Sequence, residues 1–384
     1  MCPVGTYHFS RYKDQIAEQH FLRAAELFNE GKMDGAIAEL RASLLLNPND
    51  PEAHYNVGLA LREKGESDAA IAEFRTALRV GPNDFDTRYN LAGLLQAARD
   101  LRGAIAEYHA AIELKPEDLE ARNCLGNLLD ESGDPEHAMA EYETVLRLNP
   151  DHALAHYNLG RVLERVGNLD GAMGEYRTAL RLDPNYVATH NNLGGILLMT
   201  GNLPDAIAEL RTALRLDPAY SMAHNNLGGA LLKQKDLAGA IDEFRTAIRI
   251  NPNYANAHYS LGGALAENGD LDGAISEYRI AIRLNPNDTY ARHNLGNRLG
   301  EKGDLDGAIA EFRAALQIDP RLPLTHFVLG FALESKGDPA AALSEYRLCL
   351  ELDPSNAQAK AKCRDLGAKV DSKGISRWLR SWIR

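Results

Sequence analysis

Residues 153–186 read ALAHYNLGRVLERVGNLDGAMGEYRTALRLDPNY, and this stretch decides the fold. Its first half places apolar residues at helical spacing, at Leu159, Val162, Leu163 and Val166. Gly167 then ends the predicted helix, and Asn168 or Asp170 can accept hydrogen bonds from the free N–H groups that open a second helix. Pro184 ends that second helix, because proline lacks the N–H that a continuing helix needs. The stretch therefore predicts two helices joined by a tight turn.

The same pattern recurs along the chain with a period of 34 residues. Each period contains a proline, at Pro48, Pro82, Pro116, Pro150, Pro184, Pro218, Pro252, Pro286, Pro320 and Pro354. Counting back from each proline as position 32 gives ten repeats over residues 17–356, which we number 1 to 10, without insertion or deletion. We therefore expect a leader over 1–16, a C-terminal segment over 357–384, and ten tandem units between them at 17–50, 51–84, 85–118, 119–152, 153–186, 187–220, 221–254, 255–288, 289–322 and 323–356.

Several positions of the repeat keep one kind of residue. Leucine fills position 11, alanine position 20 and glutamate position 23 in all ten repeats, and glycine fills position 8 in eight of them. Position 24 is large and apolar throughout, as in Leu40, Phe74 and Tyr176. Small residues at positions 8 and 20 let two helices approach closely, and the large side chain at position 24 fills the space beyond.

This pattern resembles the tetratricopeptide repeat family, whose signature is a small residue at position 8, alanine at 20, an aromatic residue at 24 and proline at 32. The chain departs from that family at position 4, where His or Arg replaces the frequent tryptophan, and at position 11, where leucine replaces tyrosine. The resemblance implies an all-α, right-handed superhelical solenoid. The first helix of each repeat (helix A) should line a concave groove, and the second (helix B) should lie outside. Such a solenoid would be one elongated domain with a continuous core.

Composition and charge exclude several classes of protein. The 384 residues carry a net charge of −12, which argues against a nucleic-acid binder. Mean hydropathy is −0.34, and no run approaches the roughly 18 apolar residues of a membrane span. The first 15 residues lack the apolar core of a signal peptide, and the four cysteines form no CxxC pair. We expect a cytoplasmic protein with idle thiols.

No motif in the sequence predicts catalysis, a metal or a cofactor. The position-23 glutamates are expected to be solvated or locally paired, because nothing brings two of them together. His152 and His156 stand four residues apart, but no third ligand joins them, and a structural metal site normally needs four. The double glycines at Gly194, Gly228 and Gly262 fall inside helix A rather than after a strand, so they are not phosphate loops.

The groove is the best candidate for a binding site. The resemblance places positions 2, 5, 6, 9, 12 and 13 of helix A on the concave side. A side-chain amide there offers a donor and an acceptor that match the peptide unit of an extended chain. The candidate residues are Asn56, Asn90, Asn158, Asn191, Asn192, Asn225, Asn226 and Asn294, with Tyr259 at position 5. This row is similar to the asparagine-lined repeats of protein O-GlcNAc transferases; a merely polar, solvated face is the alternative. The amides of Asn158, Asn192 and Asn226 are predicted to face solvent rather than the core.

The groove changes character along the chain. Position 2 is acidic in repeats 1 to 4 and neutral or apolar in repeats 5 to 7. Leu198, Met199 and Leu232 add apolar side chains that packing does not require, which suggests a contact patch in repeats 6 and 7. Positions 2, 5 and 6 contain no Lys or Arg in any repeat. This absence disfavours the chaperone-tail ligands that other members of the family clamp with basic residues.

The C-terminal segment differs from the repeats. Residues 357–366 are expected to form an extra helix that caps the last repeat. Residues 356–384 carry a net charge of +6, which leaves −18 on the other 355 residues. An apolar stripe near the end includes the only two tryptophans, at Trp378, Leu379, Trp382 and Ile383. This amphipathic tail could dock on the solenoid, on a partner or on an anionic membrane.

Together these features predict a non-catalytic scaffold that binds a protein or an extended peptide. Two alternatives remain open: a substrate-recruiting subunit of a glycosyltransferase or other enzyme encoded elsewhere, and a peripheral membrane assembly factor that uses its basic tail. No nucleic acid is expected as a partner, and a membrane surface only through the tail.

Overall fold

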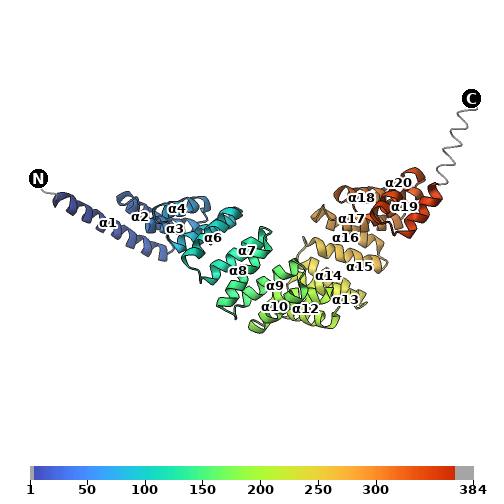
Figure 1. Ribbon diagram of the computed structural model, residues 1–384, viewed down its shortest axis with the longest axis horizontal. Coiled ribbons are helices and arrows are strands. Elements are labelled where there is room, and N and C mark those ends of the chain that lie inside the picture. The colour runs from blue at the N-terminus through green and yellow to red at the C-terminus, as the bar shows by residue number, and fades with distance from the viewer. Residues whose placement is uncertain (1–3, 368–384) are drawn as a thin grey trace, which may run out of the picture. The chain divides into compact units, whose positions relative to one another are not determined.

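The computed structural model of the protein describes residues 4–367, with side chains from residue 15 onward, and every regular element in that range is an α-helix (Figure 1). The helices follow one another in consecutive helix–turn–helix pairs, as predicted. The chain divides into two compact units, Met1–Pro184 and Asn185–Arg384, each with its own apolar core. The single elongated domain that the repeat pattern suggests stays a prediction.

The N-terminal unit contains five helix pairs. They are α1 (Val4–Asn29) and α2 (Met33–Leu46), α3 (Pro51–Glu63) and α4 (Ser67–Val80), α5 (Phe85–Ala97) and α6 (Leu101–Leu114), α7 (Leu119–Glu131) and α8 (Pro135–Leu148), and α9 (Ala153–Arg165) and α10 (Leu169–Leu182). The helix α1 is twice as long as the other odd-numbered helices because no proline or glycine pair interrupts it, so it also covers most of the predicted leader.

The C-terminal unit contains five more pairs. They are α11 (Val187–Met199) and α12 (Leu203–Leu216), α13 (Ser221–Lys233) and α14 (Leu237–Ile250), α15 (Ala255–Glu267) and α16 (Leu271–Leu284), α17 (Thr289–Glu301) and α18 (Leu305–Ile318), and α19 (Pro323–Ser335) and α20 (Pro339–Leu352). Residues 357–367 form a further helix, as the sequence predicts. Its Leu366 is buried in the core of this unit, and the ammonium group of Lys362 donates a hydrogen bond of 2.9 Å to Glu334 on α19.

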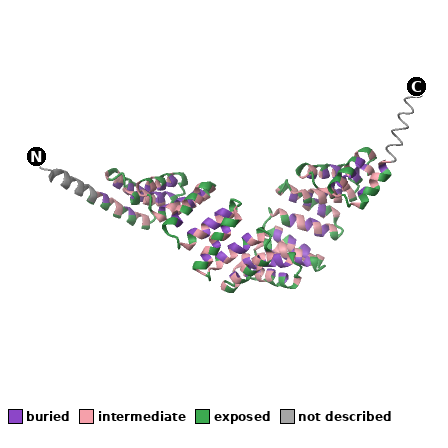
Figure 2. Ribbon diagram, viewed as in Figure 1, coloured by how far each residue is buried: buried purple, intermediate pink, exposed green. Residues whose placement is uncertain are grey.

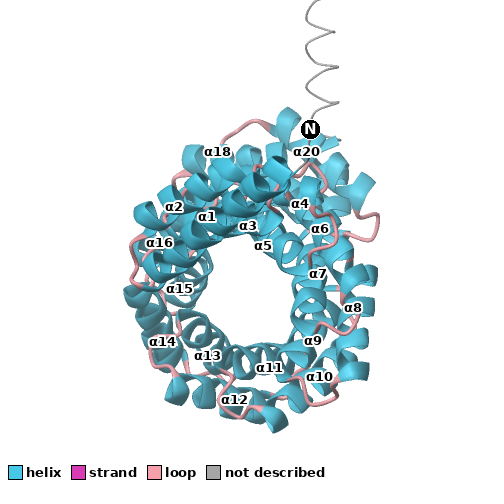
Figure 3. Cartoon of the chain, turned by 90° about the vertical axis from the view of Figure 1, so that its left-hand side faces the viewer, coloured by secondary structure: helices cyan, strands magenta, loops and turns pink. Residues whose placement is uncertain are grey.

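Odd-numbered and even-numbered helices lie on opposite faces of each unit (Figure 3). In the N-terminal unit, α3, α5, α7 and α9 follow the inner side of their row, and α4, α6, α8 and α10 the outer side. In the C-terminal unit, α11, α13 and α15 lie inside α12, α14 and α16 in the same way. Helix A of the sequence analysis is thus the odd-numbered helix, and helix B the even-numbered one.

The core of each unit lies between the two rows of helices, as the buried residues in Figure 2 show. Repeat 5 illustrates the packing that the sequence predicts. Ala172 on α10 is fully buried, and Gly160 on α9 lies so close to the Tyr176 ring that a Cβ atom on this glycine would be 2.7 Å from it. In this repeat, the Tyr176 ring therefore requires glycine at position 8.

The turns between paired helices also follow the sequence. Gly167 adopts a left-handed conformation, with φ of +85°, and ends α9. Of the two capping candidates, Asn168 is the cap, because its Oδ1 accepts a hydrogen bond of 3.1 Å from the Gly171 N–H. In repeats 3 and 7, Arg99 and Lys235 take the left-handed conformation at the glycine position.

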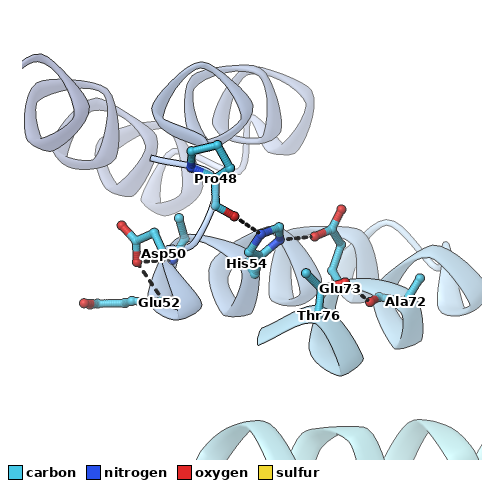
Figure 4. Close-up of polar contacts among 8 residues, drawn as sticks. Pro48, Asp50, Glu52, His54, Ala72, Glu73 and Thr76 are labelled. Atoms are coloured by element: carbon cyan, nitrogen blue, oxygen red, sulfur yellow. Dashed lines mark hydrogen bonds and ion pairs between the residues drawn. The ribbon is translucent and has the colours of Figure 1, made fainter. Parts of the chain in front are cut away.

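The position-23 glutamates have a structural partner that the sequence analysis did not identify. In every repeat, the His or Arg at position 4 of helix A bonds to the glutamate at position 23 of helix B. Figure 4 shows one example: the His54 ring lies between the Glu73 carboxylate, 2.6 Å from Nδ1, and the Pro48 carbonyl, 3.1 Å from Nε2. One side chain thus connects helix A to helix B and to the end of the preceding repeat.

We expect Glu277→Ala to lower the free energy of unfolding by about 1–3 kcal/mol, because it leaves a buried ring nitrogen without a partner. His258 Nδ1 lies 2.6 Å from the Glu277 carboxylate, and the other ring nitrogen lies 3.0 Å from the Pro252 carbonyl. Urea unfolding measures the effect. Glu267→Ala is the control, since Glu267 is exposed and has no polar partner among the described residues. Equal stability of the two variants would contradict a structural role for the pair.

Candidate functional site

The predicted groove residues all lie on odd-numbered helices. In the N-terminal unit these are Asn56 on α3, Asn90 on α5 and Asn158 on α9. In the C-terminal unit they are Asn191, Asn192 and Leu198 on α11, Asn225, Asn226 and Leu232 on α13, Tyr259 on α15 and Asn294 on α17. The two sets belong to different units and are described separately below. The predicted tail residues Trp378, Leu379, Trp382 and Ile383 lie outside the described residues.

Positions 2, 6, 9 and 13 of an odd-numbered helix are three or four residues apart and therefore form one stripe along it. We call this the inner stripe. On α11 it consists of Ala188, Asn192, Gly195 and Met199; on α13 of Met222, Asn226, Gly229 and Lys233; and on α15 of Asn256, Ser260, Gly263 and Glu267. None of these twelve residues is buried, so the stripe is accessible from solvent.

The position-6 amides form hydrogen bonds between repeats. In the C-terminal unit, Asn226 Nδ2 donates to Asn191 Oδ1 over 2.9 Å. In the N-terminal unit, Asn158 Nδ2 donates to Asn123 Oδ1 over the same distance. Where position 5 is tyrosine, its phenol oxygen is the acceptor. Asn90 donates to Tyr55, and Asn294 donates to Tyr259. Each bond joins position 6 of one repeat to position 5 of the repeat before it.

The prediction that the position-6 amides face solvent is wrong for Asn158. Asn158 and Asn191 are each only 4% exposed. They are buried because consecutive odd-numbered helices approach closely, and the amide of one helix must reach the side chain of the next to satisfy its hydrogen-bonding groups. Asn226 is half-buried, and its Oδ1 has no partner among the described residues, which leaves one acceptor for a ligand.

Position 5 serves packing more than recognition. The Tyr259 ring lies 5.8 Å from the Tyr278 ring of the same repeat, and burial raises the pKa of Tyr259. His293 occupies position 5 of repeat 9, where it packs at 5.8 Å on Phe312 and burial lowers its pKa. Asn225 Oδ1 is buried without a partner among the described residues. These side chains mainly contact other parts of the protein.

The double glycines of repeats 6 to 8 differ in what surrounds them. A Cβ atom on Gly194, Gly228 or Gly262, at position 8, would lie 2.7 to 3.0 Å from the position-24 side chain, so packing requires glycine there. A Cβ atom on Gly195, Gly229 or Gly263, at position 9, would meet nothing nearer than 3.9, 3.6 and 3.6 Å, respectively. Those are ordinary contacts, so packing does not explain the position-9 glycines.

Apolar side chains lie beside the position-9 glycines. Met199, at the end of the stripe on α11, is 67% exposed, and Met222, at the start of the stripe on α13, is 43% exposed. Leu198 and Leu232 are half-buried and pack against the core of the unit. The two methionines therefore present more apolar surface to a ligand than the two leucines that the sequence analysis selected.

The two histidines that stand four residues apart bond to other groups of the protein. Nowhere among the described residues do three or more His, Cys, Asp or Glu side chains gather closely enough to hold a metal ion. His152 Nδ1 accepts a hydrogen bond from the Ala155 N–H, as the cap of α9. His156 contacts Glu175 and the Pro150 carbonyl. Both imidazoles are thus engaged in the fold.

One feature could have been found from the sequence and was not, and a second was noted but not explained. Position 4 is always His or Arg, and position 23 is always Glu, which is the signature of a pair that spans the two helices. Three successive repeats also keep a second glycine at position 9 although glycine destabilises a helix interior. A destabilising glycine that packing does not explain indicates a functional requirement rather than a structural one.

A curved row of paired helices with an exposed inner stripe is characteristic of helical repeat scaffolds. Family models described as "Tetratricopeptide repeat" match residues 21–85, 89–142, 125–187 and 191–255, then 231–295, and finally 325–356. A model described as "TPR repeat" matches residues 296–337. The chain belongs to the tetratricopeptide repeat family.

Several solved structures share the fold. The APC/C hetero-tetramer Cut9–Hcn1 aligns over 91% of this chain and 76% of its own, with 15% identity and a TM-score of 0.57. A tetratricopeptide repeat protein from Parabacteroides merdae aligns over 65% and 99%, with 18% identity and a TM-score of 0.51. PilF of Pseudomonas aeruginosa aligns over 56% and 97%, with 20% identity and a TM-score of 0.50. At these identities the likeness concerns the fold alone.

Family membership gives a general function. Tetratricopeptide repeats generally mediate protein–protein interactions and are typically non-catalytic. No match was found among the curated proteins. Within the part of the chain that the structure describes, no helix has both the length and the apolar character to cross a membrane.

Proposed function

We propose that the protein is a non-catalytic scaffold and that the inner stripe of α11, α13 and α15 binds an extended polypeptide segment. The position-9 glycines carry this proposal. A glycine in a helix interior costs about 0.8–1.0 kcal/mol relative to alanine, and at Gly195, Gly229 and Gly263 packing does not offset that cost. Close approach of a bound backbone is a reason for glycine that the fold itself does not supply.

The surroundings of the glycines suit an extended chain. Met199 and Met222 offer flexible apolar surface, which adapts to different side chains. The free Oδ1 of Asn226 can accept a backbone N–H, a bond worth about 0.5–1.5 kcal/mol net. Affinity therefore comes mainly from apolar contact, and the amides contribute less than the sequence pattern suggests, because many of their groups already join the repeats.

The length of the ligand follows from helix spacing. Neighbouring helices lie roughly 8–10 Å apart, so α11 to α15 spans about 16–20 Å. An extended chain advances about 3.3 Å per residue, so about six residues cross the three helices. The resemblance to the asparagine-lined repeats of O-GlcNAc transferases stays a prediction, as do the enzyme-subunit and membrane-assembly alternatives.

The test uses a displayed library of random peptides selected on the full chain. A photo-crosslinking residue in place of Met199 or Met222 should capture the selected peptides. The same residue in place of Arg211 should not, because Arg211 is exposed on the even-numbered helix α12. Capture from Arg211 alone would move the binding surface to the even-numbered helices and contradict the proposal.

A further inference from the structure

The N-terminal unit contains a hollow of about 550 Å³ between α3 and α5, beside the turn that connects α4 to α5. Its lining combines apolar residues with carboxylates: Pro51, Tyr55 and Pro82, and Glu52, Asp84 and Asp86. A hollow of this composition suits a ligand that carries a positive charge on an apolar stem.

Gly81 also lines the hollow, and no other repeat has glycine at this position, which is position 31. The backbone does not require glycine there. Gly81 has φ of −125° and ψ of 85°, and Asp353 at the same position of repeat 10 has −131° and 87°. A Cβ atom on Gly81 would lie 3.1 Å from Pro51, yet repeat 10 combines Pro323 at position 1 with Asp353. Eight other repeats have Asp or Asn at position 31, so glycine leaves out side-chain atoms at the wall of the hollow.

Two of the three carboxylates are available to a cationic ligand. Asp84 is held in the fold, because it accepts a hydrogen bond of 2.9 Å from the Thr87 N–H. Glu52 and Asp86 are exposed, and no cation among the described residues pairs with either. Figure 4 shows the Glu52 side chain pointing away from the His54 ring. The basic side chains of α3 and α5 bond to other carboxylates: His54 to Glu73, Arg62 to Glu63 and Arg88 to Glu107.

The tyrosine in the hollow lies close to these charges. Burial raises the pKa of Tyr55, the negative charges of Asp86 and Asp84 raise it further, and the positive charge of Arg62 lowers it. A guanidinium pairs with carboxylates through two parallel hydrogen bonds and also stacks on aromatic rings. The ammonium group of lysine is a compact, strongly hydrated charge that does neither. The hollow therefore favours arginine over lysine.

The acidic surface continues beyond the hollow within the same unit. Residues 17–152 contain 26 Asp or Glu and 13 Lys or Arg. Neighbouring helices lie roughly 8–10 Å apart, and an extended chain advances about 3.3 Å per residue, so about three residues separate one repeat from the next. Position 2 is an exposed carboxylate in each of repeats 1 to 4, at Glu18, Glu52, Asp86 and Glu120. A polypeptide with several basic residues fits this surface better than a small cation.

We propose that the hollow between α3 and α5 binds an arginine side chain from a basic polypeptide segment of a partner protein. The guanidinium faces Glu52 and Asp86, and the methylene groups contact Pro51 and Pro82. Further basic residues, at about every third position of the segment, reach the position-2 carboxylates of adjacent repeats. The site uses no residue of the inner stripe of α11, α13 and α15, so it stands or falls independently of the proposed peptide-binding function.

Fluorescence anisotropy of a labelled peptide on the full chain tests the proposal. The probe repeats the tripeptide Gly-Ser-Arg four times, and two matched probes carry lysine or citrulline in place of every arginine. The arginine probe should bind most tightly. The lysine probe should bind more weakly, because it keeps the charge and loses the paired hydrogen bonds, and the citrulline probe should be weakest, because it has no charge. Added salt should weaken binding of both charged probes.

The decisive variant is Glu52→Gln with Asp86→Asn, which removes the charges and keeps the shapes. If each exposed pair has ordinary strength, the Kd of the arginine probe should rise about 2- to 30-fold. The matched control is Asp68→Asn with Glu113→Gln, which changes the net charge equally at exposed residues on even-numbered helices of the same unit. Gly81→Asn, which adds side-chain atoms at the wall of the hollow, should also weaken binding. Far-UV circular dichroism confirms that all three variants remain folded.

Four outcomes would overturn the proposal. Failure of the arginine probe to bind the native chain would remove the site outright. Equal affinity for the arginine and lysine probes, with an equal response to both double variants, would show that net charge alone attracts the peptide. Binding that responds to neither double variant would place the arginine site elsewhere on the protein. Unchanged affinity in the folded Gly81→Asn variant would show that the peptide does not enter the hollow.

Discussion

Replacing Gly195, Gly229 and Gly263 together by alanine should stabilise the C-terminal unit and weaken its binding of an extended peptide. Each alanine favours the helix by about 0.8–1.0 kcal/mol, so the free energy of unfolding should rise by roughly 2–3 kcal/mol. The new methyl groups meet neighbours no nearer than 3.6 Å, so they cause no strain.

Binding should change in the opposite direction. Three methyl groups along the inner stripe lift a bound backbone away from the helices and lengthen its hydrogen bonds. Loss of the bond to Asn226 Oδ1 costs about 0.5–1.5 kcal/mol, which is roughly a 2- to 13-fold loss of affinity, and weaker apolar contact with Met199 and Met222 adds to it. Urea unfolding gives the stability, and fluorescence anisotropy of a library-selected peptide gives the affinity.

The control is Gly174→Ala on α10, an exposed helical glycine with nothing within 4 Å of the new Cβ atom. It should stabilise its own unit and leave peptide affinity unchanged. If the triple variant also kept its affinity, the stripe would not be the binding surface. If the triple variant were less stable than the native chain, packing would require these glycines after all.

The fold could be predicted because its determinants are local. Within a repeat, Gly160, Ala172 and Tyr176 meet across one pair of helices joined by a short turn, so their spacing in the sequence largely defines the contact. The ten-fold repetition adds evidence to that interpretation. The bounds of α9 and α10 follow from Gly167, Asn168 and Pro184 in the same way.

The site was harder to predict because it depends on how successive repeats are rotated against each other. The bond from Asn158 to Asn123 joins residues 35 positions apart, and no single repeat contains both. Position 6 looks solvent-exposed in an isolated helix A, yet at Asn158 the amide is buried against the preceding repeat. Sequence spacing therefore placed the candidate amides on the odd-numbered helices, and it misjudged the exposure of Asn158.

Phe244→Ala should destabilise the C-terminal unit by about 3–5 kcal/mol, because it removes a large side chain that is 1% exposed and leaves a cavity between α13 and α14. Contacts in a repeat protein are mainly between neighbours, so the damage should be local. Hydrogen exchange should show lost protection in α13, α14 and the helices beside them, while α3 and α4 keep theirs.

The same residue tests why position 8 is glycine. A Cβ atom on Gly228 would lie 2.7 Å from the Phe244 ring, so Gly228→Ala alone should cost about 1–3 kcal/mol as the ring is displaced. With Phe244→Ala already present, the clash is gone, and the alanine should instead stabilise the helix by about 1 kcal/mol. The double-mutant cycle should therefore give a coupling of about 2–4 kcal/mol.

Repeat 3 shows how the packing adjusts when position 8 is not glycine. There Ala92 fills position 8 and Tyr108 fills position 24. The planes of the Tyr89 and Tyr108 rings make an angle of 77°. In repeat 8, where Gly262 accompanies Tyr278, the Tyr259 and Tyr278 ring planes make an angle of 56°.

If the aromatic ring turns freely to admit a methyl group, Gly228→Ala will cost less than about 0.5 kcal/mol in both backgrounds and the coupling will vanish. A reversal of sign between the two backgrounds would establish that the Phe244 ring is what disfavours alanine at position 8 of repeat 7.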